Sequence, residues 1–494
     1  MAGEEHRKLY KKSGKDTFEI QLAVKDSLLS GQRRERERLL TRKRLKVESL
    51  NEATCKLSAE KEQLRVEGAT KLLKSGQKVE ALTALHQCFA RDSKNAETFI
   101  KCEGLPLLHS CLLSTNSSVL HAAAWCSINL TAADSHAVQK ALRLSPFLIQ
   151  FLSGSDSTMQ ELCAWAIGNL AGDSQSNKET LLGQGVIPHL LNLVSTPHHV
   201  MVETRTQSVL HALINLARDT TYKCCRCMLE NSLFSSLKIL LKEVPESSQL
   251  CQEIGWLTSC VYSREEIFSE ILNANQCGTI LHLVVDKLLH LSCLPQDESK
   301  EKMMIPYLLC CGNMIGLSTE LALLASDLPM FLPAMKACLS SSSNAILLDT
   351  VWTLSNFCAE PSCRALVVSQ SELMSRLLSL CNEADIHFEL LSEVLSLMEG
   401  MVRVSCVMNR LLIKQGTLEN LSHLLKNSKS TVADKILSIM EILLQDLDLP
   451  QQPPGALSYV RESLQYLTTI SFDIKLVERT KAVMELFPLS TSSV

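Results

Sequence analysis

The chain has 494 residues, of which 46% are hydrophobic and only 4% aromatic, with 18 glycines and 14 prolines. This composition is typical of helices and excludes a large β-sheet. Charge is uneven, because residues 1–50 hold 14 Lys and Arg against 8 Asp and Glu, whereas the remainder holds 35 against 45. A basic arm on an acidic body favours charged partners.

Residues 1–55 are predicted to form this arm. Asp16 can cap a helix that has Glu19 three residues later, and the helical pattern runs to about Ser49. The arm could bind an acidic partner, fold back on its own body, or remain a solvated helix or coiled coil. Nucleic acid is disfavoured because no aromatic residues interleave. The basic residues of its second half are Arg33, Arg34, Arg36, Arg38, Arg42, Lys43, Arg44 and Lys46.

Twenty cysteines occur in the chain, mostly inside apolar helical runs, where free cysteine behaves as a small buried hydrophobe. The first residues, MAGEEHRKLYKK, lack the apolar segment of a signal peptide. We therefore expect reduced thiols in a reducing compartment. Cys224 and Cys227 form one CxxC motif, but no second ligand pair lies at zinc-ribbon spacing. The sequence predicts no metal and no cofactor.

From about residue 62 to 450 the sequence repeats, and all four tryptophans lie in similar segments: AAAWCSINLTA, ELCAWAIGNLAG, QEIGWLTSCVY and DTVWTLSNFCA. An asparagine, or its replacement, follows four residues after the tryptophan or its replacement. The pairs are Trp125–Asn129, Trp165–Asn169, His211–Asn215, Trp256–Cys260, Leu309–Asn313 and Trp352–Asn356. Their spacing of 40 to 53 residues is close to that of armadillo and HEAT repeats, which run about 40–47 residues.

Each unit is predicted to contain a short helix, a second helix that begins at motifs such as EGLPLL, LSPFLI, QGVIPHL or KQGTLENL, and the helix with the Trp/Asn pair. Such units bury their apolar faces only by stacking. The predicted fold is all-α, a right-handed superhelical solenoid of about eight or nine armadillo repeats. The repeats are degenerate after residue 360, where Glu399 and Glu441 take the asparagine position. PQDESKEK (295–302) is predicted to be a surface loop, and residues 456–487 are predicted to cap the solenoid.

The segment MMIPYLLCCGNMIGLSTELALL (303–324) is the nearest candidate for a membrane span. It contains Pro306, Asn313 and Glu320, and the helix is expected to break near Gly316–Ser318. A solenoid helix that is buried on all sides has the same hydropathy. The buried helix is the favoured interpretation, and a multi-pass membrane protein is the alternative.

Tryptophan and asparagine four residues apart share one helical face, so stacked repeats would align these pairs in a row. The asparagine amide offers one acceptor and two donors and can hold the backbone of an extended peptide. Indole rings form slots for long aliphatic stems and attract a terminal cation. Glu161 and Asp173 are placed to select Lys or Arg at these slots. The alternative is that each tryptophan simply belongs to the core.

ELCAWAIGNLAGDS and VWTLSNFCAEP resemble armadillo repeats of importin-alpha, the adaptor that carries nuclear localisation signals. The resemblance implies a major and a weaker second peptide site. His211 replaces a tryptophan, Cys260 replaces the polar residue, and Leu309 offers no indole. The implied major site is Trp125, Asn129, Glu161, Trp165, Asn169, Asp173, His211 and Asn215, and the second is Asn313, Trp352 and Asn356.

YKKSGKDT and the basic helix that follows resemble the importin-beta-binding segment of importin-alpha. This implies an importin-beta-type carrier as a partner, and it implies that residues 42–44 could occupy the chain's own row and inhibit it. The chain is also similar to the transmembrane and coiled-coil domain-containing protein 6 family, in EIGWLTSCVYS and VWTLSNFCAEPSCRALV. That family pairs an Arg/Glu-rich N-terminal helix with degenerate armadillo repeats.

The expected function is therefore a non-enzymatic nuclear-import adaptor, or a divergent relative of one, present in cytoplasm and nucleus. Its expected partners are Lys/Arg-rich peptides and the carrier, without nucleic acid or membrane. The alternatives are a degenerate scaffold without cargo and the membrane protein. The sequence contains no phosphate-binding glycine loop, nucleophile elbow or paired metal-ligand motif that would indicate an enzyme.

Overall fold

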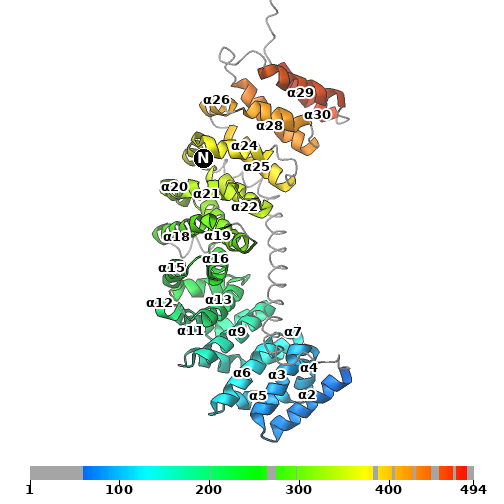
Figure 1. The fold of residues 1–494 in the computed structure, drawn as a ribbon, viewed down its shortest axis with the longest axis vertical. Coiled ribbons are helices and arrows are strands. Elements are labelled where there is room, and N and C mark those ends of the chain that lie inside the picture. The colour runs from blue at the N-terminus through cyan, green and yellow to red at the C-terminus, as the bar shows by residue number, and fades with distance from the viewer. Residues whose placement is uncertain are drawn as a thin grey trace, which may run out of the picture. The chain divides into compact units, whose positions relative to one another are not determined.

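The computed structural model describes most of the chain after residue 58, and every element in the described segments is a helix (Figure 1). The chain divides into two compact units, Met1–Cys260 and Val261–Val494. The predicted basic arm of residues 1–55, with all its Arg and Lys side chains, lies outside the described residues. These are residues 59–200, 202–263, 274–295, 298–381, 388–402, 406–414, 416–426, 430–446, 456–470 and 474–486.

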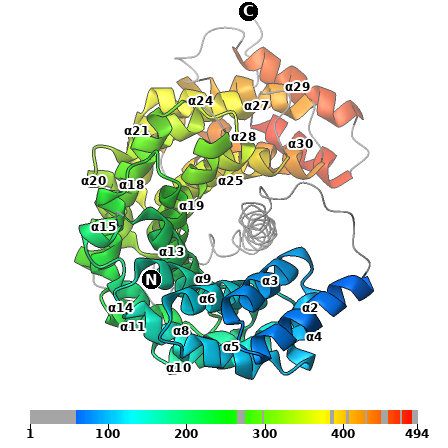
Figure 2. The ribbon, with the colours of Figure 1, turned by 60° about the horizontal axis from the view of Figure 1, so that its bottom comes forward.

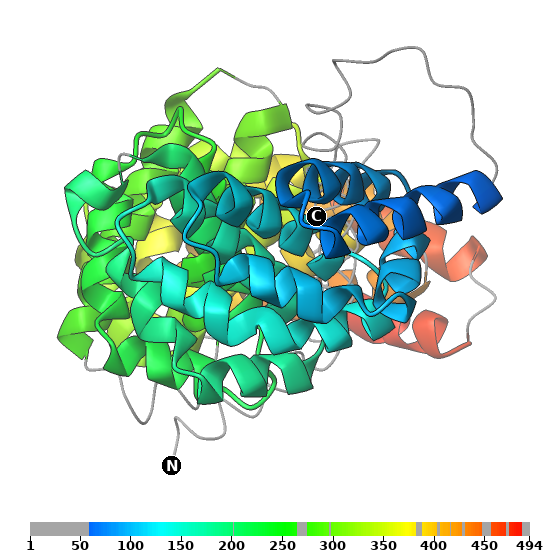
Figure 3. The same ribbon diagram turned by 90° about the horizontal axis from the view of Figure 1, so that it is seen from below.

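The first unit repeats a three-helix pattern of a short first helix, a second helix and a longer third helix. In Figure 3 its helices, blue to green, are stacked as roughly parallel rods. In chain order they are α2 (Ala59–Lys74), α3 (Lys78–Arg91), α4 (Lys94–Lys101), α5 (Gly104–Leu112), α6 (Ser117–Thr131), α7 (Ser135–Ala141), η1 (Leu142–Leu144), α8 (Ser145–Leu152), α9 (Ser157–Asp173), α10 (Gln175–Gly183), α11 (Val186–Asn192), α12 (Pro197–Val200), α13 (Glu203–Ala217), α14 (Lys223–Glu230), α15 (Leu233–Glu243) and α16 (Leu250–Val261).

The second unit continues the same order of helices, and its last two helices, α29 and α30, pack on α27 and α28. Its helices are α18 (Ala274–Cys293), α19 (Glu298–Leu317), α20 (Thr319–Asp327), α21 (Phe331–Leu339), α22 (Asn344–Phe357), α23 (Pro361–Ser369), α24 (Ser371–Cys381), α25 (Phe388–Val402), α26 (Cys406–Lys414), α27 (Thr417–Lys426), α28 (Ser430–Gln445), α29 (Ala456–Ile470) and α30 (Ile474–Glu485).

Third helices of successive repeats pack on one another within each unit. In the first unit α3, α6, α9 and α13 form one layer, and Figure 2 shows it on the side opposite α5, α8 and α11. In the second unit α19, α22, α25 and α28 form the corresponding layer. The buried core is mainly Leu, Ala, Val, Ile and Cys, so each repeat completes its core against its neighbours. The predicted all-α armadillo stacking is confirmed.

Second helices begin where one residue adopts a left-handed backbone conformation. Glu103, Gly185, Ser232 and Gly416 have φ between 61° and 80°, directly before α5, α11, α15 and α27. Such a residue turns the chain sharply, and it costs energy at positions without glycine. The predicted starts EGLPLL, QGVIPHL and KQGTLENL are thereby confirmed. At LSPFLI the short helix η1 precedes α8, whose first turn contains a proline.

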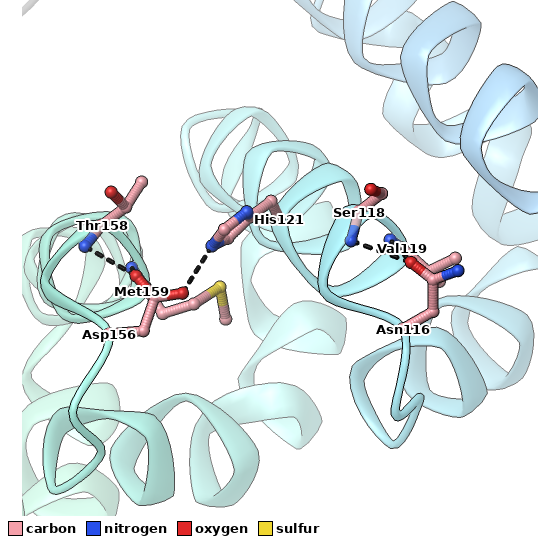
Figure 4. Close-up of polar contacts among 7 residues, drawn as sticks. All are labelled: Asn116, Ser118, Val119, His121, Asp156, Thr158 and Met159. Carbon is pink, nitrogen blue, oxygen red and sulfur yellow. Dashed lines mark hydrogen bonds and ion pairs between the residues drawn. The ribbon is translucent and has the colours of Figure 1, made fainter.

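The third helices α6 and α9 begin at side-chain caps (Figure 4). Asn116 Oδ1 accepts from Ser118 N at 2.9 Å, and Asp156 Oδ1 accepts from Thr158 N at 2.9 Å. His121 Nε2 lies 2.7 Å from Asp156 Oδ2, so the cap of α9 is also bonded to α6. Each cap satisfies backbone N–H groups that the first helical turn leaves unpaired.

The first helices are tied to the preceding third helix by buried polar side chains that sequence analysis did not identify. Asn95 Nδ2 donates to Cys88 O at 2.8 Å, Asn177 Nδ2 to Leu170 O at 3.1 Å, and Asn409 Nδ2 to Val402 O at 2.9 Å. In another repeat the fully buried Arg364 donates from Nε to Cys358 O at 2.7 Å. These bonds satisfy carbonyls that the helix C-terminus leaves without an intrahelical partner.

Asn177→Ala is expected to destabilise the first unit by about 1–3 kcal/mol, because it leaves the buried Leu170 carbonyl without this donor. Asn344→Ala, at an exposed position at the start of α22, is the matched control and should change stability by less than about 0.5 kcal/mol. Urea denaturation followed by circular dichroism measures both. Equal effects of the two substitutions would contradict the role of Asn177.

Two predictions about residues 295–324 have different outcomes. The expected break near Gly316–Ser318 is confirmed, because α19 ends at Leu317 and Ser318 caps α20. The surface loop predicted for 295–302 is wrong in its second half, because α19 begins at Glu298. Lys300 is buried there, and its ammonium donates to Ser292 O at 2.8 Å and Leu294 O at 2.6 Å. It thus bonds the Ser292 carbonyl in the last turn of α18 and the Leu294 carbonyl directly after that helix, at its negative end.

Within the described segments, no individual helix has the length and apolar composition needed to cross a membrane. The helices α20 and α21 meet that criterion only when taken together, and they are bent by 90° at the break between them.

Candidate peptide-binding row

The predicted site residues lie on third helices. We call the pairs Trp125–Asn129 on α6, Trp165–Asn169 on α9, His211–Asn215 on α13 and Trp352–Asn356 on α22, together with Asn313 on α19, the Trp/Asn row. Because α6 packs on α9 and α9 on α13, three consecutive pairs lie on neighbouring helices of the first unit. The members on α19 and α22 lie on neighbouring helices of the second unit.

The asparagines of the row are bonded to the preceding repeat. Asn169 Nδ2 donates to Ile128 O at 3.3 Å, Asn215 Nδ2 to Gly168 O at 2.8 Å, and Asn356 Nδ2 to Gly312 O at 3.0 Å. In these three cases the accepting residue lies directly before the asparagine position of the preceding repeat. Asn129 Nδ2 donates in the same way to His86 O at 3.1 Å. At least one amide donor of each of these residues therefore holds the stack together.

The row is more recessed than the sequence predicts. Trp165 is 8% exposed and Asn169 is fully buried, whereas Trp125, His211 and Trp352 are half-buried. The expected exposure of the row is wrong at Asn169, because its Nδ2 bonds Ile128 O and its buried Oδ1 has no hydrogen-bond partner. A peptide backbone could reach this amide only if neighbouring side chains moved.

Rings of the row lie on glycines of the preceding third helix. A Cβ at Gly312 would lie 2.1 Å from Trp352 Cζ3, and a Cβ at Gly168 would lie 2.4 Å from His211 Cδ2. Only a residue without a side chain leaves room for a ring this close to the helix backbone. Gly168 and Gly312 are therefore part of the row, which the sequence pattern alone did not reveal.

His86 on α3 completes the row at its N-terminal end and was not predicted. Its ring lies 5.5 Å from the Trp125 ring in an edge-on arrangement, and its Nδ1 is 2.7 Å from Asn129 Nδ2. Burial lowers the pKa of His86, against the opposing effect of a hydrogen bond with the Trp125 backbone. The neutral imidazole is the form that can accept a hydrogen bond from the Asn129 amide.

The predicted carboxylates Glu161 and Asp173 are half-buried and contact neighbouring repeats. Glu161 Oε2 accepts from Thr204 Oγ1 at 2.7 Å, and Asp173 Oδ2 accepts from Ser135 Oγ at 3.1 Å. Both carry negative charge close to the row. A positive charge also lies beside the row, and sequence analysis did not identify it. Arg218 Nη1 lies 3.4 Å from Asn215 Oδ1.

Comparisons with known proteins agree with this architecture. Residues 142–172, from η1 through most of α9, match the family described as Armadillo/beta-catenin-like repeat. Over 310 residues the chain is 25% identical to importin subunit alpha-9 of Arabidopsis thaliana, which covers 61% of this chain and 57% of that protein. The chain therefore has an armadillo-repeat fold, and its sequence is similar to that of an importin alpha subunit. It spans little more than half the length of importin subunit alpha-9.

One further similarity covers a shorter stretch of sequence, and another is to a solved structure. A probable importin subunit alpha-A of Dictyostelium discoideum is 31% identical over 98 residues, or 19% of this chain and 18% of that protein. The crystal structure of an engineered protein from the Northeast Structural Genomics Consortium covers 85% of this chain and 98% of that chain, with a TM-score of 0.67 and 17% identity. The similarity to the engineered protein, at 17% identity, shows only that the two chains share a fold.

In the last repeats of this armadillo chain, other polar residues take the place of the row. Glu399 on α25 and Glu441 on α28 are half-buried. Lys435 Nζ donates to Ser392 Oγ at 2.9 Å and to Ser396 Oγ at 2.8 Å, so α28 is bonded to α25 without asparagine. The third helices remain connected here, but by lysine and serine, which explains why the sequence repeat becomes degenerate while the fold continues.

The cysteines of the described segments are free thiols, and most are buried. Burial raises the pKa of Cys381 to about 12, which keeps this thiol protonated and unreactive at neutral pH. Cys224 of the CxxC motif is buried in α14, and Cys227 is half-buried there. Among the residues that the structure describes, no three His, Cys, Asp or Glu side chains gather in a way that could hold a metal ion.

Proposed function

We propose that the chain is a nuclear-import adaptor-like scaffold that binds Lys/Arg-rich extended peptides along the third helices of its first unit. The observation that carries the proposal is the succession of ring–amide pairs on α6, α9 and α13, with carboxylates beside them. The similarity to importin subunit alpha-9 supports it. In this function the chain would be present in both cytoplasm and nucleus.

In the proposed complex, the half-buried ring of Trp125 and the edge of Trp165 contact the aliphatic stems of the peptide. Glu161 and Asp173 supply negative charge for the Lys or Arg head groups, at positions where they already accept hydrogen bonds from hydroxyl groups. The amides of Asn129 and Asn215 would serve the peptide backbone by giving up their present contacts with the His86 and His211 rings. The proposed second site, of Asn313, Trp352 and Asn356, is weaker because Leu309 provides no ring.

The N-terminal arm, including Arg42, Lys43 and Arg44, is the proposed contact for an importin-beta-type carrier and an inhibitor of the row. A tethered segment competes at an effective concentration often in the millimolar range, so it can exclude weak cargo. We also propose that the chain is a member of the transmembrane and coiled-coil domain-containing protein 6 family.

The test is fluorescence anisotropy with a labelled Lys/Arg-rich peptide, on the full chain and on a chain that begins at residue 59. The double substitution Trp165→Ala and Asn169→Ala is expected to weaken binding at least about tenfold. Because both side chains are largely buried, circular dichroism must show that the variant still folds. Asn344→Ala, at an exposed position of the second unit eight residues before Trp352, is the matched control. Absence of binding at about 50 μM peptide, or binding unchanged by the double substitution, would reject the site.

A second candidate function is a scaffold that has lost peptide binding. The full burial of Asn169 and the carboxylates at positions 399 and 441 favour it. Such a chain would still bind a carrier through its arm. Binding of the full chain to an importin-beta-type receptor, together with no affinity for basic peptides, would identify this function.

A further inference from the structure

His211 stands where other repeats of the row have tryptophan. Its ring lies over Gly168 on α9, with Cδ2 2.4 Å and Nε2 3.1 Å from where a Cβ would be. His211 is half-buried, whereas Asn169 on α9 is fully buried. The imidazole thus occupies a position equivalent to the one that Trp352 occupies over Gly312.

The amide of Asn215 fixes the chemistry of the imidazole. Asn215 Nδ2 donates to Gly168 O at 2.8 Å, and Asn215 Oδ1 lies 3.4 Å from Arg218 Nη1. Both contacts require the same orientation of the amide. Asn215 Nδ2 is also 3.3 Å from His211 Nε2, and an amide nitrogen can only donate. His211 Nε2 is therefore the acceptor, and the neutral ring carries its proton on Nδ1.

Carboxylates on the elements around His211 already accept hydrogen bonds from neighbouring repeats. Glu161 on α9 already accepts from Thr204, and Glu253 near the start of α16 accepts from Gln207. Arg218, which directly follows α13, adds a positive charge beside Asn215. Among the described side chains, the other charged or histidine residues on elements packed against α13 are Asp173 on α9 with Asp156 at its N-cap, His189 on α11, His198 on α12, and Lys223, Arg226 and Glu230 on α14.

We propose that His211 makes binding of a basic side chain at this position depend on pH, with the neutral imidazole as the binding form. The inference rests on the proposed function and adds regulation to it. Protonation places an N–H at Nε2, which then faces the Asn215 N–H, so the hydrogen bond is lost. It also places a positive charge where the stem and head group of a Lys or Arg would lie. An indole at the same position has neither effect.

The experiment measures binding of a labelled Lys/Arg-rich octapeptide to the full chain by fluorescence anisotropy, between pH about 7.5 and about 5.5, where histidine ordinarily titrates. The wild-type affinity is expected to fall at least about threefold on acidification. His211→Trp should bind about tenfold more tightly than wild type at pH about 5.5 and show no such fall. His211→Gln should also lose the pH dependence, without the gain in affinity.

His121→Gln is the control for general effects of histidine loss, since His121 bonds the Asp156 cap and no member of the row. It should retain the wild-type pH dependence. Peptide binding that changes equally with pH in wild type and both His211 variants would overturn the inference and leave the proposed function intact. Absence of binding by every variant at both pH values would overturn the proposed function and the inference with it. Binding by His211→Trp alone would also overturn the inference, because the neutral imidazole of the wild-type chain would then not be a binding form.

Discussion

Gly312→Ala is expected to destabilise the second unit by about 1–3 kcal/mol. A methyl group there would lie 2.1 Å from Trp352 Cζ3, 2.6 Å from its Cε3 and 2.9 Å from Thr353 Oγ1. These distances are too short for any non-bonded contact, so the indole must move away from α19. The same movement would stretch the bond from Asn356 Nδ2 to Gly312 O. Urea denaturation and hydrogen exchange of α19 and α22 measure the loss.

The control for this prediction is Gly68→Ala, because Gly68 lies inside α2 and nothing is within 4 Å of its added Cβ. Alanine is favoured over glycine inside a helix by about 1 kcal/mol, so this substitution should stabilise. The two substitutions are thus expected to have opposite signs. If Gly312→Ala also stabilised the chain, the position of the Trp352 ring would not depend on having glycine at residue 312.

The fold was predictable because the period of the sequence reflects the physical unit of stacking. Tryptophan and asparagine four residues apart mark the third helix of a repeat, and the helices α6, α9, α13 and α22 are found at those markers. Motifs such as QGVIPHL mark the second helix, because a left-handed residue such as Gly185 is needed there to turn the chain. These signals are local, so one sequence is enough to recognise them.

What the row does was harder to predict, because it depends on contacts across repeats. The periodicity places Asn169 and Asn215 on one face, but it does not show that each amide donates to a carbonyl of the preceding helix. Likewise, a charged run at 295–302 indicated a loop, whereas the Lys300 ammonium is buried against carbonyls at the end of α18. Hydrogen-bond partners some 40 residues apart are fixed by packing, and composition does not determine packing.

The hydrogen bonds of the asparagines near the starts of the first helices could not be predicted from composition either. Asn95, Asn177 and Asn409 read as ordinary polar residues near helix starts, yet each bonds a carbonyl seven residues earlier. Asn177 lies eight residues after Asn169, a spacing that could have been found in the sequence. The Asn169 side chain, for example, joins two repeats, whereas the Asn177 side chain joins two consecutive helices, α9 and α10. The repeat therefore has two sets of asparagines with separate structural roles.

Asp349→Asn is expected to stabilise the second unit by up to about 4 kcal/mol above pH 7, since one pKa unit corresponds to about 1.4 kcal/mol. Asp349 on α22 is 8% exposed, and among the described residues nothing donates a hydrogen bond to its carboxylate. Burial raises its pKa to about 7, well above the ordinary value of 3.8. In the folded chain the ionised form is therefore unfavourable.

The sign of the pH dependence follows from the raised pKa. Well below pH 3.8, the ordinary pKa, the carboxyl is protonated in both states and carries no penalty. As the pH rises toward 7, the unfolded state loses its proton first, so this carboxyl progressively lowers stability, and the loss is complete above pH 7. Asparagine cannot ionise, so the difference between Asp349→Asn and wild type should be near zero at pH about 4 and largest at pH about 8. Urea denaturation at the two pH values measures it.

Asp219→Asn provides a control of opposite sign. Burial by itself would raise the pKa of Asp219, but hydrogen bonds from Thr221 N, Gln175 Nε2 and Cys224 N outweigh burial and hold the pKa at about 2. The ionised carboxylate is stabilising above pH 4, and this contribution is lost as the pH falls toward 2. Asp219→Asn should therefore destabilise the first unit at neutral pH by about 1–2 kcal/mol. A stabilising effect of Asp349→Asn that is as large at pH 4 as at pH 8 would show that ionisation of Asp349 is not its cause.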